Sequence, residues 1–359
     1  MNKISGLTLS RGDFEEQIVL NQLAISEVKW WKENVLKGFK NILVPKVSVL
    51  IFTDASNEGW GMVCDDFVTG GRWNEQEKNL HINVLELRGV KFALKCLTAI
   101  ESMSHVRVRS DSMTAVTYMN KMGGTKSKLC LKEVKEIFEF MMGKNVWLSA
   151  EFIAGKDNIQ ADRASRKFNE DIEWCLEESV FSVISSSLGC PVIDLFASRL
   201  NNKVSRFASW QPDPDAETTD AFSITWNNDF FYAFPPFSLI PLCLKKCLLD
   251  QAEGILIAPI WPTQVWFPKL MRLLIAKPLV LPANCISLRG KQHPLKKMRL
   301  MACKLSGILT KGRDFRKVLS KSSQLHGGLG QQNSIRCILK SGIISVIDGI
   351  KIPCIVMKK

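Results

Sequence analysis

The chain has 359 residues, of which 46% are hydrophobic and 23% charged, so it is long and apolar enough for one or two domains with substantial cores. No run approaches the roughly 18 consecutive apolar residues of a membrane span, and the N-terminus lacks the apolar stretch of a secretory signal. We therefore expect an intracellular protein of the cytoplasm or nucleus, with no membrane partner. Eleven scattered cysteines and only four histidines argue against a zinc module.

The net charge of +13 at pH 7 is unevenly distributed. Residues 289–359 hold 16 Lys and Arg against two acidic residues, and the preceding part of the chain is close to neutral. We expect 289–359 to form a basic tail. Such a tail either binds the phosphate backbone of a nucleic acid or is only solvated.

The local pattern predicts an α/β domain over residues 46–168, preceded by a helical segment at 1–45 that contains Trp30 and Trp31. β-branched runs bounded by turn residues predict strands, and apolar residues three or four positions apart predict helices. The first, fourth and fifth strands are expected to be parallel, which gives a mixed sheet flanked by helices. The expected elements are strands at 46–53, 60–64 and 67–73, a helix at 82–100, a strand at 105–109, helices at 114–121 and 128–142, a strand at 146–153 and a helix at 160–166.

The remainder of the chain predicts a second, smaller α/β region. Residues 169–189 are acidic and helical in pattern, and we expect them to form a linker. Residues 190–288 then contain strand candidates at 191–196, 230–234 and 254–260, separated by proline-rich turns. The basic tail at 289–359 would follow this region.

Four carboxylates occupy positions from which they could converge. Asp54 and Asp111 each follow an apolar strand, Glu86 lies on the apolar stripe of the helix between these strands, and Asp162 lies at the start of the last helix. A lone ionised carboxylate on a buried face costs several kcal/mol unless it is paired or bound to a metal. Carboxylates without His or Cys nearby favour Mg²⁺ or Mn²⁺. We expect a site for two such ions, which can activate a water for attack on a phosphodiester.

Each of these acids, taken alone, is more often an ordinary residue of a turn or a helix cap. The order in which the four occur favours a shared site. The pattern therefore predicts Asp54, Glu86, Asp111 and Asp162 as both the catalytic residues and the metal ligands.

The same residues resemble the ribonuclease H domain of retroelement reverse transcriptases, and most closely that of the DIRS-type, tyrosine-recombinase retrotransposons. The resemblance implies a ribonuclease H-like fold and endonucleolytic hydrolysis of the RNA strand of RNA–DNA hybrids. It also implies a reverse transcriptase polymerase domain as a possible partner, with 28–31 similar to the connection between polymerase and nuclease. The motifs that carry it are Thr53-Asp54-Ala55-Ser56, Gly59-Trp60-Gly61, His81-Ile82-Asn83, Leu85-Glu86-Leu87-Arg88, Ser110-Asp111-Ser112, Asn120-Lys121-Met122-Gly123-Gly124-Thr125 and the run from Asn158 to Arg166.

Two features depart from that family. Many ribonucleases H carry a histidine in the loop before the last acid, and the matching position here is Phe152. The polymerase motif Tyr-x-Asp-Asp is also missing, because Cys64-Asp65-Asp66-Phe67 lacks the tyrosine and lies in the expected hairpin. The chain thus looks like a C-terminal piece of a longer element protein.

The second region resembles the Dam-like adenine methyltransferases at residues 192–198 and 233–237. The residues that differ from those enzymes are ones that would bind the methyl donor and the adenine. Ala197 and Arg199 stand where glycines would cradle the methyl donor, and Phe234 replaces the polar residue that would accept hydrogen bonds from an adenine amine. The resemblance implies a degenerate methyltransferase-like region.

Three functions compete on this basis. The first is metal-dependent cleavage of RNA–DNA hybrids, in agreement with the four acids. The second is a non-catalytic, nucleic-acid-binding relic or domesticated module, in agreement with the missing histidine and polymerase. The third, a DNA methyltransferase, has the weakest support.

Overall fold

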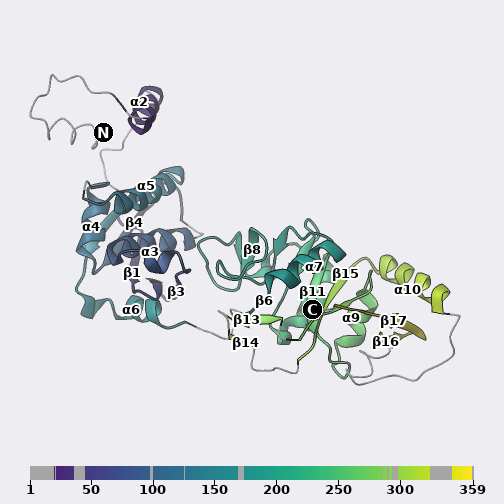
Figure 1. Ribbon diagram of the computed structural model, residues 1–359. Coiled ribbons are helices and arrows are strands. Elements are labelled where there is room, and N and C mark those ends of the chain that lie inside the picture. Colours follow the sequence, from purple (N-terminus) through teal and green to yellow (C-terminus); the bar gives the residue numbers. More distant parts are fainter. Residues whose placement is uncertain are drawn as a thin grey trace, which may run out of the picture. The chain divides into compact units, whose positions relative to one another are not determined.

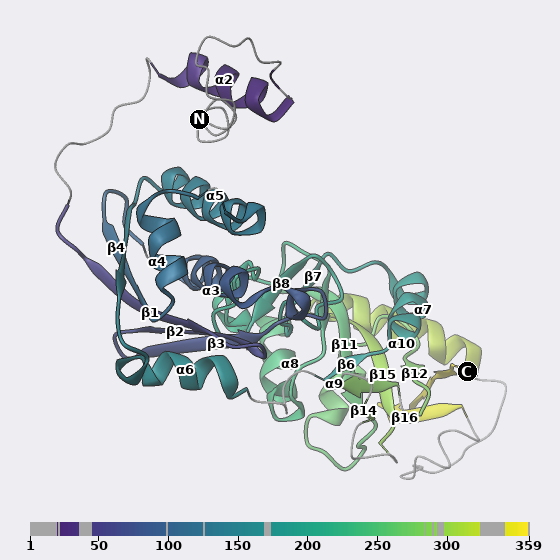
Figure 2. The same cartoon turned by 60° about the vertical axis from the view of Figure 1, so that its left-hand side comes forward.

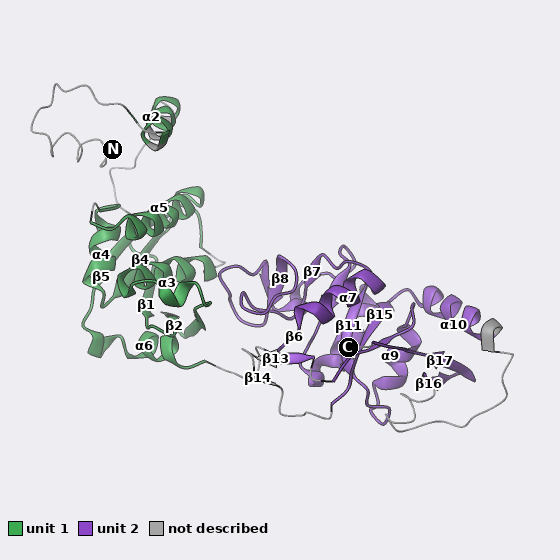
Figure 3. Ribbon diagram, viewed as in Figure 1, with its two compact units in different colours: residues 1–168 green, residues 169–359 purple. Residues whose placement is uncertain are grey.

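The computed structural model describes residues 20, 22–35, 45–97, 100–124, 126–168, 174–283, 285–288, 291–292, 298–323 and 342–357. It divides the chain into two compact units, residues 1–168 and 169–359, which are coloured separately in Figure 3. The predicted N-terminal helical segment contains α2 (Gln22–Asn34), and residues 1–19, 21 and 36–44 of that prediction lie outside the described residues. Trp30 and Trp31 of α2 are each about half exposed and contact one another edge to face.

The first unit, in which Figure 1 labels β1, β3 and β4, is built on a five-stranded sheet with the order β3-β2-β1-β4-β5. β1 and β2 are antiparallel, as are β2 and β3, whereas β1, β4 and β5 are mutually parallel. The predicted mixed sheet and its parallel strands are therefore confirmed. The strands are β1 (Val49–Ala55), β2 (Gly59–Cys64), β3 (Phe67–Arg72), β4 (His105–Ser110) and β5 (Trp147–Phe152).

Helices cover both faces of this sheet, as Figure 2 shows. Three helices on one face bury the apolar core together with the strands, and α6 lies on the other face against β1, β2 and β3. Serine side chains cap two of the helices: Ser112 accepts from the N–H of Ala115, and Ser127 from that of Cys130. The helices are α3 (Ile82–Cys96), α4 (Met113–Asn120), α5 (Lys128–Gly143) and α6 (Ile159–Arg166), with short 3-10 turns η1 (Glu77–Asn79) and η2 (Gly155–Asp157).

Glycines allow α6 to lie directly on the sheet backbone. A Cβ at Gly61 would lie 2.4 Å from the carbonyl oxygen of Ala161 and 2.6 Å from the nitrogen of Ser165. A Cβ at Gly70 would lie 2.9 Å from the carbonyl oxygen of Ala164. Such contacts are too short for any side chain, so β2 and β3 accept α6 only because these positions lack one.

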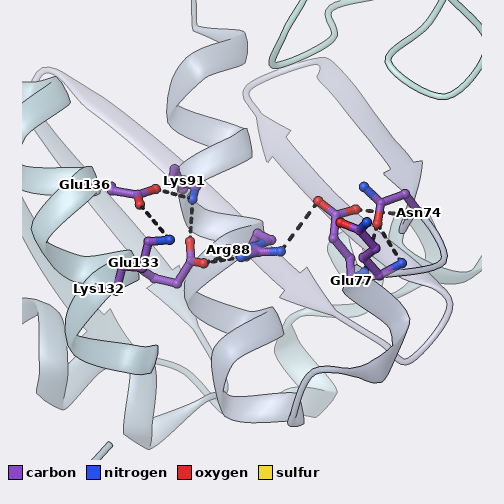
Figure 4. Close-up of polar contacts among 8 residues, drawn as sticks. Asn74, Glu77, Arg88, Lys91, Lys132, Glu133 and Glu136 are labelled. Carbon is purple, nitrogen blue, oxygen red and sulfur yellow. Dashed lines mark hydrogen bonds and ion pairs between the residues drawn. The ribbon is translucent and has the colours of Figure 1, made fainter. Parts of the chain in front are cut away.

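A buried charge network fastens α3 to α5 (Figure 4). The carboxylate of Glu133 on α5 is 2% exposed and accepts hydrogen bonds from Arg88 and Lys91 of α3. Arg88 also forms an ion pair with Glu77 of η1, at 3.6 Å. Because a buried carboxylate is tolerated only when its charge is paired, this network fixes the position of the helix that carries Glu86.

The second unit contains an eight-stranded sheet with the order β18-β12-β15-β11-β10-β7-β8-β9. β9, β8, β7, β10 and β11 are parallel, and β15 runs antiparallel between β11 and β12. Two smaller sheets accompany it, one formed by β14, β13 and β6 and the other by β16 and β17. The strands are β6 (Cys175–Leu176), β7 (Ile193–Asp194), β8 (Arg206–Ser209), β9 (Thr218–Thr219), β10 (Phe231–Ala233), β11 (Glu253–Pro259), β12 (Leu279–Val280), β13 (Ile286–Leu288), β14 (Lys291–Gln292), β15 (Leu300–Ser306), β16 (Ile343–Ile347), β17 (Ile350–Pro353) and β18 (Ile355–Val356).

The helices of this unit pack against the large sheet or beside it. α8 and α9 supply buried side chains to one apolar cluster, and α7 supplies side chains to another. Among the described residues, no helix is long and apolar enough to cross a membrane. The helices are α7 (Glu178–Leu188), α8 (Ile240–Leu249), α9 (Phe267–Leu273) and α10 (Leu309–Ser323), with 3-10 turns η4 (Ala221–Ser223) and η5 (Phe237–Leu239).

The second α/β region is confirmed, but it is larger than expected. Residues 169–189, expected as a linker, include α7, whose Phe181 and Ile184 are buried in the core of the second unit. Residues 289–359, expected as a basic tail, instead supply β15 to the interior of the large sheet. The apolar run of β15 pairs along the full length of β11. This part of the segment is therefore a folded strand, whereas its charge had suggested a tail that either binds phosphates or is only solvated.

Candidate metal centre

Asp54 lies near the carboxyl end of β1, the central strand of the first sheet. The residue is only 5% exposed, because α6 covers this face of the strand. Its Oδ2 accepts a hydrogen bond from the hydroxyl of Ser165 on α6, at 2.6 Å. Burial raises the pKa of Asp54, the Ser165 bond lowers it, and the charges of Asp111 and Asp162 raise it further.

Glu86 projects from α3 toward the same end of β1. One oxygen of its carboxylate lies within 4.8 Å of a carboxylate oxygen of Asp54 and of Asp111. Burial, followed by the charges of Asp54 and Asp111, raises the pKa of Glu86 to about 8. An acid with this pKa holds its proton at neutral pH until a positive charge arrives.

Asp111 directly follows β4, which is parallel to β1 and pairs with it. The carboxyl ends of parallel neighbours meet at one edge of a sheet, and this brings Asp111 to Asp54. The turn η2 passes close by: a Cβ at Gly155 would lie 3.0 Å from Oδ2 of Asp111. A glycine at position 155 thus leaves room for the Asp111 carboxylate.

The structure brings three of the four predicted acids together. One carboxylate oxygen from each of Asp54, Glu86 and Asp111 lies within 4.8 Å of the others. The donor set consists of hard oxygen atoms, and the mutual repulsion of the carboxylates is the energy that a divalent cation would offset. These residues fit Mg²⁺ or Mn²⁺.

Asp162 lies beside this group and does not belong to it. Its Oδ1 accepts a hydrogen bond from Nε of Arg166, one turn further along α6, at 2.7 Å. It is close enough for its charge to raise the pKa of Asp54. Asp162 therefore lies next to the three acids, with its carboxylate paired to an exposed arginine.

Sequence reasoning missed the residues that hold α6 against β1. Ser165 contacts Asp54, and the side-chain amide of Asn158 donates to the carbonyl oxygen of Thr53 at 3.0 Å. The spacing offered one usable signal, since a residue three positions after Asp162 lies on the same helix face. This spacing identifies Ser165 as a residue that could contact the site. No such spacing or sequence pattern identifies Asn158.

Phe152, at the position matched to the family's histidine, ends β5 and is 45% exposed. The histidines described in this unit have structural contacts, since His81 caps α3 and His105 bonds to Pro45 and Ser149. The run 64–67 spans the turn between β2 and β3, as expected, with Asp65 at φ 51°.

The second unit has its own acid at a comparable place, Asp194 at the end of β7. The strand order reverses between β7 and β10, and open α/β sheets bind ligands outside the strand ends at such a point. Here the loop that follows β7 closes on itself. Every backbone N–H from residue 196 to residue 203 donates to an acceptor within the unit, and Asp194 accepts two of them, from Phe196 and Lys203.

No protein family model matches the chain, and no curated protein matches it. Solved structures with similarity to part of the chain include LC11-RNase H1 in complex with an RNA/DNA hybrid, at 22% identity over 33% of this chain and 93% of that chain, with a TM-score of 0.27. The RNase H1 of the halophilic archaeon Halobacterium salinarum is 19% identical over 32% of this chain and 96% of its own, also with a TM-score of 0.27.

A further similar structure is that of the foamy viral protease-reverse transcriptase in complex with an RNA/DNA hybrid. It is 13% identical over 45% of this chain and 28% of that chain, with a TM-score of 0.24. Similarity at these identities and TM-scores carries no information on the activity of this chain. The geometry of the carboxylates is therefore the feature of this chain that bears on its function.

Proposed function

We propose that the first unit is a metal-dependent endonuclease of the ribonuclease H type, which hydrolyses the RNA strand of RNA–DNA hybrids. The observation that carries the proposal is the convergence of carboxylate oxygens from Asp54, Glu86 and Asp111 to within 4.8 Å. These residues belong to three separate elements, β1, α3 and the turn after β4. A purely structural role would not require three acids to gather where their charges repel.

Asp54, Glu86 and Asp111 would hold two Mg²⁺ or Mn²⁺ ions, with Asp162 completing the coordination. When bound, such ions activate a water and stabilise the leaving oxygen in phosphodiester hydrolysis. The protein's own contribution is orientation. The hydroxyl of Ser165 holds the carboxylate of Asp54.

Asp162 would join the site by giving up its ion pair with Arg166 and binding a metal ion instead. Its carboxylate is 45% exposed and the Arg166 side chain 59% exposed, so both can rotate without disturbing the core. An exposed ion pair of this kind is worth little, about 0–1 kcal/mol, so a cation can compete with Arg166 for the carboxylate.

The finer assignment rests on sequence motifs. The resemblance to DIRS-type retroelements supports a substrate recognised by its A-form shape and its 2′-hydroxyl groups, without reading of base sequence. It also supports a separate reverse transcriptase polymerase domain as the partner that generates the hybrid.

A non-catalytic nucleic-acid-binding module is the alternative, and one observation favours it. Phe152 offers an apolar ring where the family places a histidine, so any assistance from an imidazole is lost. Such a module would keep the fold and bind hybrids without cleaving them.

The deciding experiment incubates the full chain with a labelled RNA–DNA hybrid, in Mg²⁺, Mn²⁺ or EDTA. We expect RNA cleavage only with a metal, and its loss in Asp111→Asn. Asp157→Asn is the matched control, because Asp157 is an exposed acid of the neighbouring turn η2 and is not in the group of three acids. Metal-independent cleavage, or an unchanged rate in Asp111→Asn, would contradict the proposal; binding without cleavage would establish the alternative.

A further inference from the structure

Ser165 is a buried serine with an unusual set of partners. It lies in the last turn of α6 and is completely buried. Its hydroxyl oxygen is 2.6 Å from Oδ2 of Asp54, although the two residues are 111 positions apart in the sequence. A hydrogen bond to an ionised carboxylate is shorter and roughly twice as strong as one between neutral groups. The contact is thus a specific link between α6 and an acid of the proposed metal site.

The hydroxyl of Ser165 has one hydrogen and two acceptors within reach. The second acceptor is the carbonyl oxygen of Asp162, at 2.9 Å. An ionised carboxylate attracts the hydrogen more strongly than a neutral carbonyl does. When Asp54 is charged, as a metal ligand must be, the hydrogen of Ser165 goes to Asp54.

The position of Ser165 is itself fixed from two sides. Its carbonyl oxygen accepts a hydrogen bond from the hydroxyl of Ser56, at 2.7 Å. The absence of a side chain at Gly61 lets the sheet approach its backbone nitrogen, where a Cβ would lie only 2.6 Å away. The carbonyl oxygen of Ser56 is in turn held by the indole N–H of Trp73, at 2.8 Å. These contacts prevent the serine from following Asp54 if the carboxylate rotates.

We propose that Ser165 is a positioning residue, which orients the Asp54 carboxylate for metal binding; this inference rests on the proposed function. Ser165 binds Oδ2, and among the described residues no donor is bonded to Oδ1. Oδ1 is then the atom offered to a cation. The same bond holds α6 against β1, which keeps Asp162, one turn earlier on the helix, beside the other acids.

The test is a calorimetric titration of the full chain with Mn²⁺ alone, for the wild type and for Ser165→Ala. Loss of a residue that hydrogen-bonds a metal ligand weakens metal affinity by about 10- to 100-fold. We expect at least about a tenfold loss, and a matching rise in the Mn²⁺ concentration that gives half-maximal hybrid cleavage. The KM for the hybrid at saturating Mn²⁺ should be unchanged, because Ser165 is buried and would not touch the substrate.

Ser149→Ala is the matched control. Ser149 lies in the same unit, on β5, and its hydroxyl hydrogen-bonds His105 at 2.7 Å, away from the acids. This variant loses a comparable side-chain hydrogen bond and should keep wild-type Mn²⁺ affinity. Hydrogen exchange of α6 in the metal-free proteins checks that Ser165→Ala retains the helix.

The outcomes separate the two proposals. If the wild type binds no Mn²⁺, the proposed function fails, and the inference fails with it. If the wild type binds Mn²⁺ and Ser165→Ala binds within about twofold of it, the positioning role alone is overturned. An equal loss in Ser149→Ala would also overturn it, by assigning the effect to general destabilisation.

Discussion

Each unit has a buried aspartate at the carboxyl end of a sheet strand. The two carboxylates differ in the hydrogen-bond donors and the charges that surround them. Asp54 is 5% exposed and Asp194 is 2% exposed. Both carboxylate oxygens of Asp194 accept backbone N–H groups from its own loop, those of Phe196 and Lys203. Asp54 has a single hydroxyl donor, and two further carboxylates lie close to it.

This difference distinguishes an acid that organises a loop from the acid of the proposed metal site. The Asp194 carboxylate organises a loop in which eight consecutive backbone N–H groups, those of residues 196–203, are already bonded, so none of these N–H groups is left to hold a ligand. The group around Asp54 brings three carboxylates together, and the donor bonded to Asp54 is the single hydroxyl of Ser165. A buried charge with few such donors is the more informative sign of a binding site.

Neutralising each aspartate in turn is the most direct test of this contrast. A bound metal ion stabilises the charge of the transition state by several kcal/mol. Because Asp54→Asn removes one of the proposed metal ligands, it should slow hybrid cleavage by about 100-fold or more. Asp194→Asn should leave the rate unchanged. The measurement is initial cleavage rate at saturating Mg²⁺; equal effects of the two substitutions would show that the distinction is mistaken.

The sequence predicted much of the first unit, because its signals are local. Strand ends, the helix that carries Glu86 and the parallel order all follow from periodicity and from turn residues. The sequence pattern at Asp54 and Asp194 is the same, however: a short apolar strand, then an aspartate. The distinction comes from residues far along the chain, such as Ser165 for Asp54, and from loop closure around Asp194.

The second unit was harder to predict for the same reason. The charge of residues 289–359 suggested a tail that either binds phosphates or is only solvated, while β15 within it pairs with β11 on one side and β12 on the other. The pairing of Asp162 with Arg166 is local, at i and i+4, and could have been anticipated from spacing. Where Asp162 lies relative to the other three acids depends on how α6 packs on the glycines of β2 and β3.

Metal should protect the first unit and not the second. A ligand that binds only the native state stabilises it by about 2.7 kcal/mol at 100 times its Kd. Hydrogen exchange with and without Mg²⁺ should therefore slow in peptides from β1, α3 and α6, and stay constant in those from β7 and the loop after it. Protection of both units, or of neither, would remove the contrast between the two sites.

The affinity for metal should rise with pH. In the metal-free protein, burial and then the charges of Asp54 and Asp111 hold the pKa of Glu86 at about 8, so a cation must displace a proton below that pH. We expect Mg²⁺ affinity to increase by up to about tenfold from pH 7 to pH 8, with proton uptake by the buffer. Calorimetry in buffers of different ionisation enthalpy measures both; a pH-independent affinity without proton release would contradict the assignment of Glu86 as a ligand.

The smallest effect is expected at Asp194, in the stability of the second unit. Burial raises the pKa of Asp194 to about 7, outweighing its two backbone hydrogen bonds. A raised pKa means that the folded state holds the proton more tightly than the unfolded state, so this contribution is full below the unfolded pKa and is lost as pH rises through 7. Between pH 6 and pH 8 the loss is roughly 1 kcal/mol, since one pH unit below the pKa corresponds to about 1.4 kcal/mol.

Asp194→Asn removes the titration while keeping the shape and one acceptor oxygen. Urea unfolding at pH 6 and pH 8, with the units distinguished by mass spectrometry of proteolytic fragments, should show the decline in the wild type and a flatter response in the variant. Added Mg²⁺ should leave both results unchanged, because no other carboxylate joins Asp194 in a ligand group among the described residues. If Mg²⁺ instead abolished the pH dependence in the wild type, Asp194 would belong to a cation site, and the closed loop would have to open to form it.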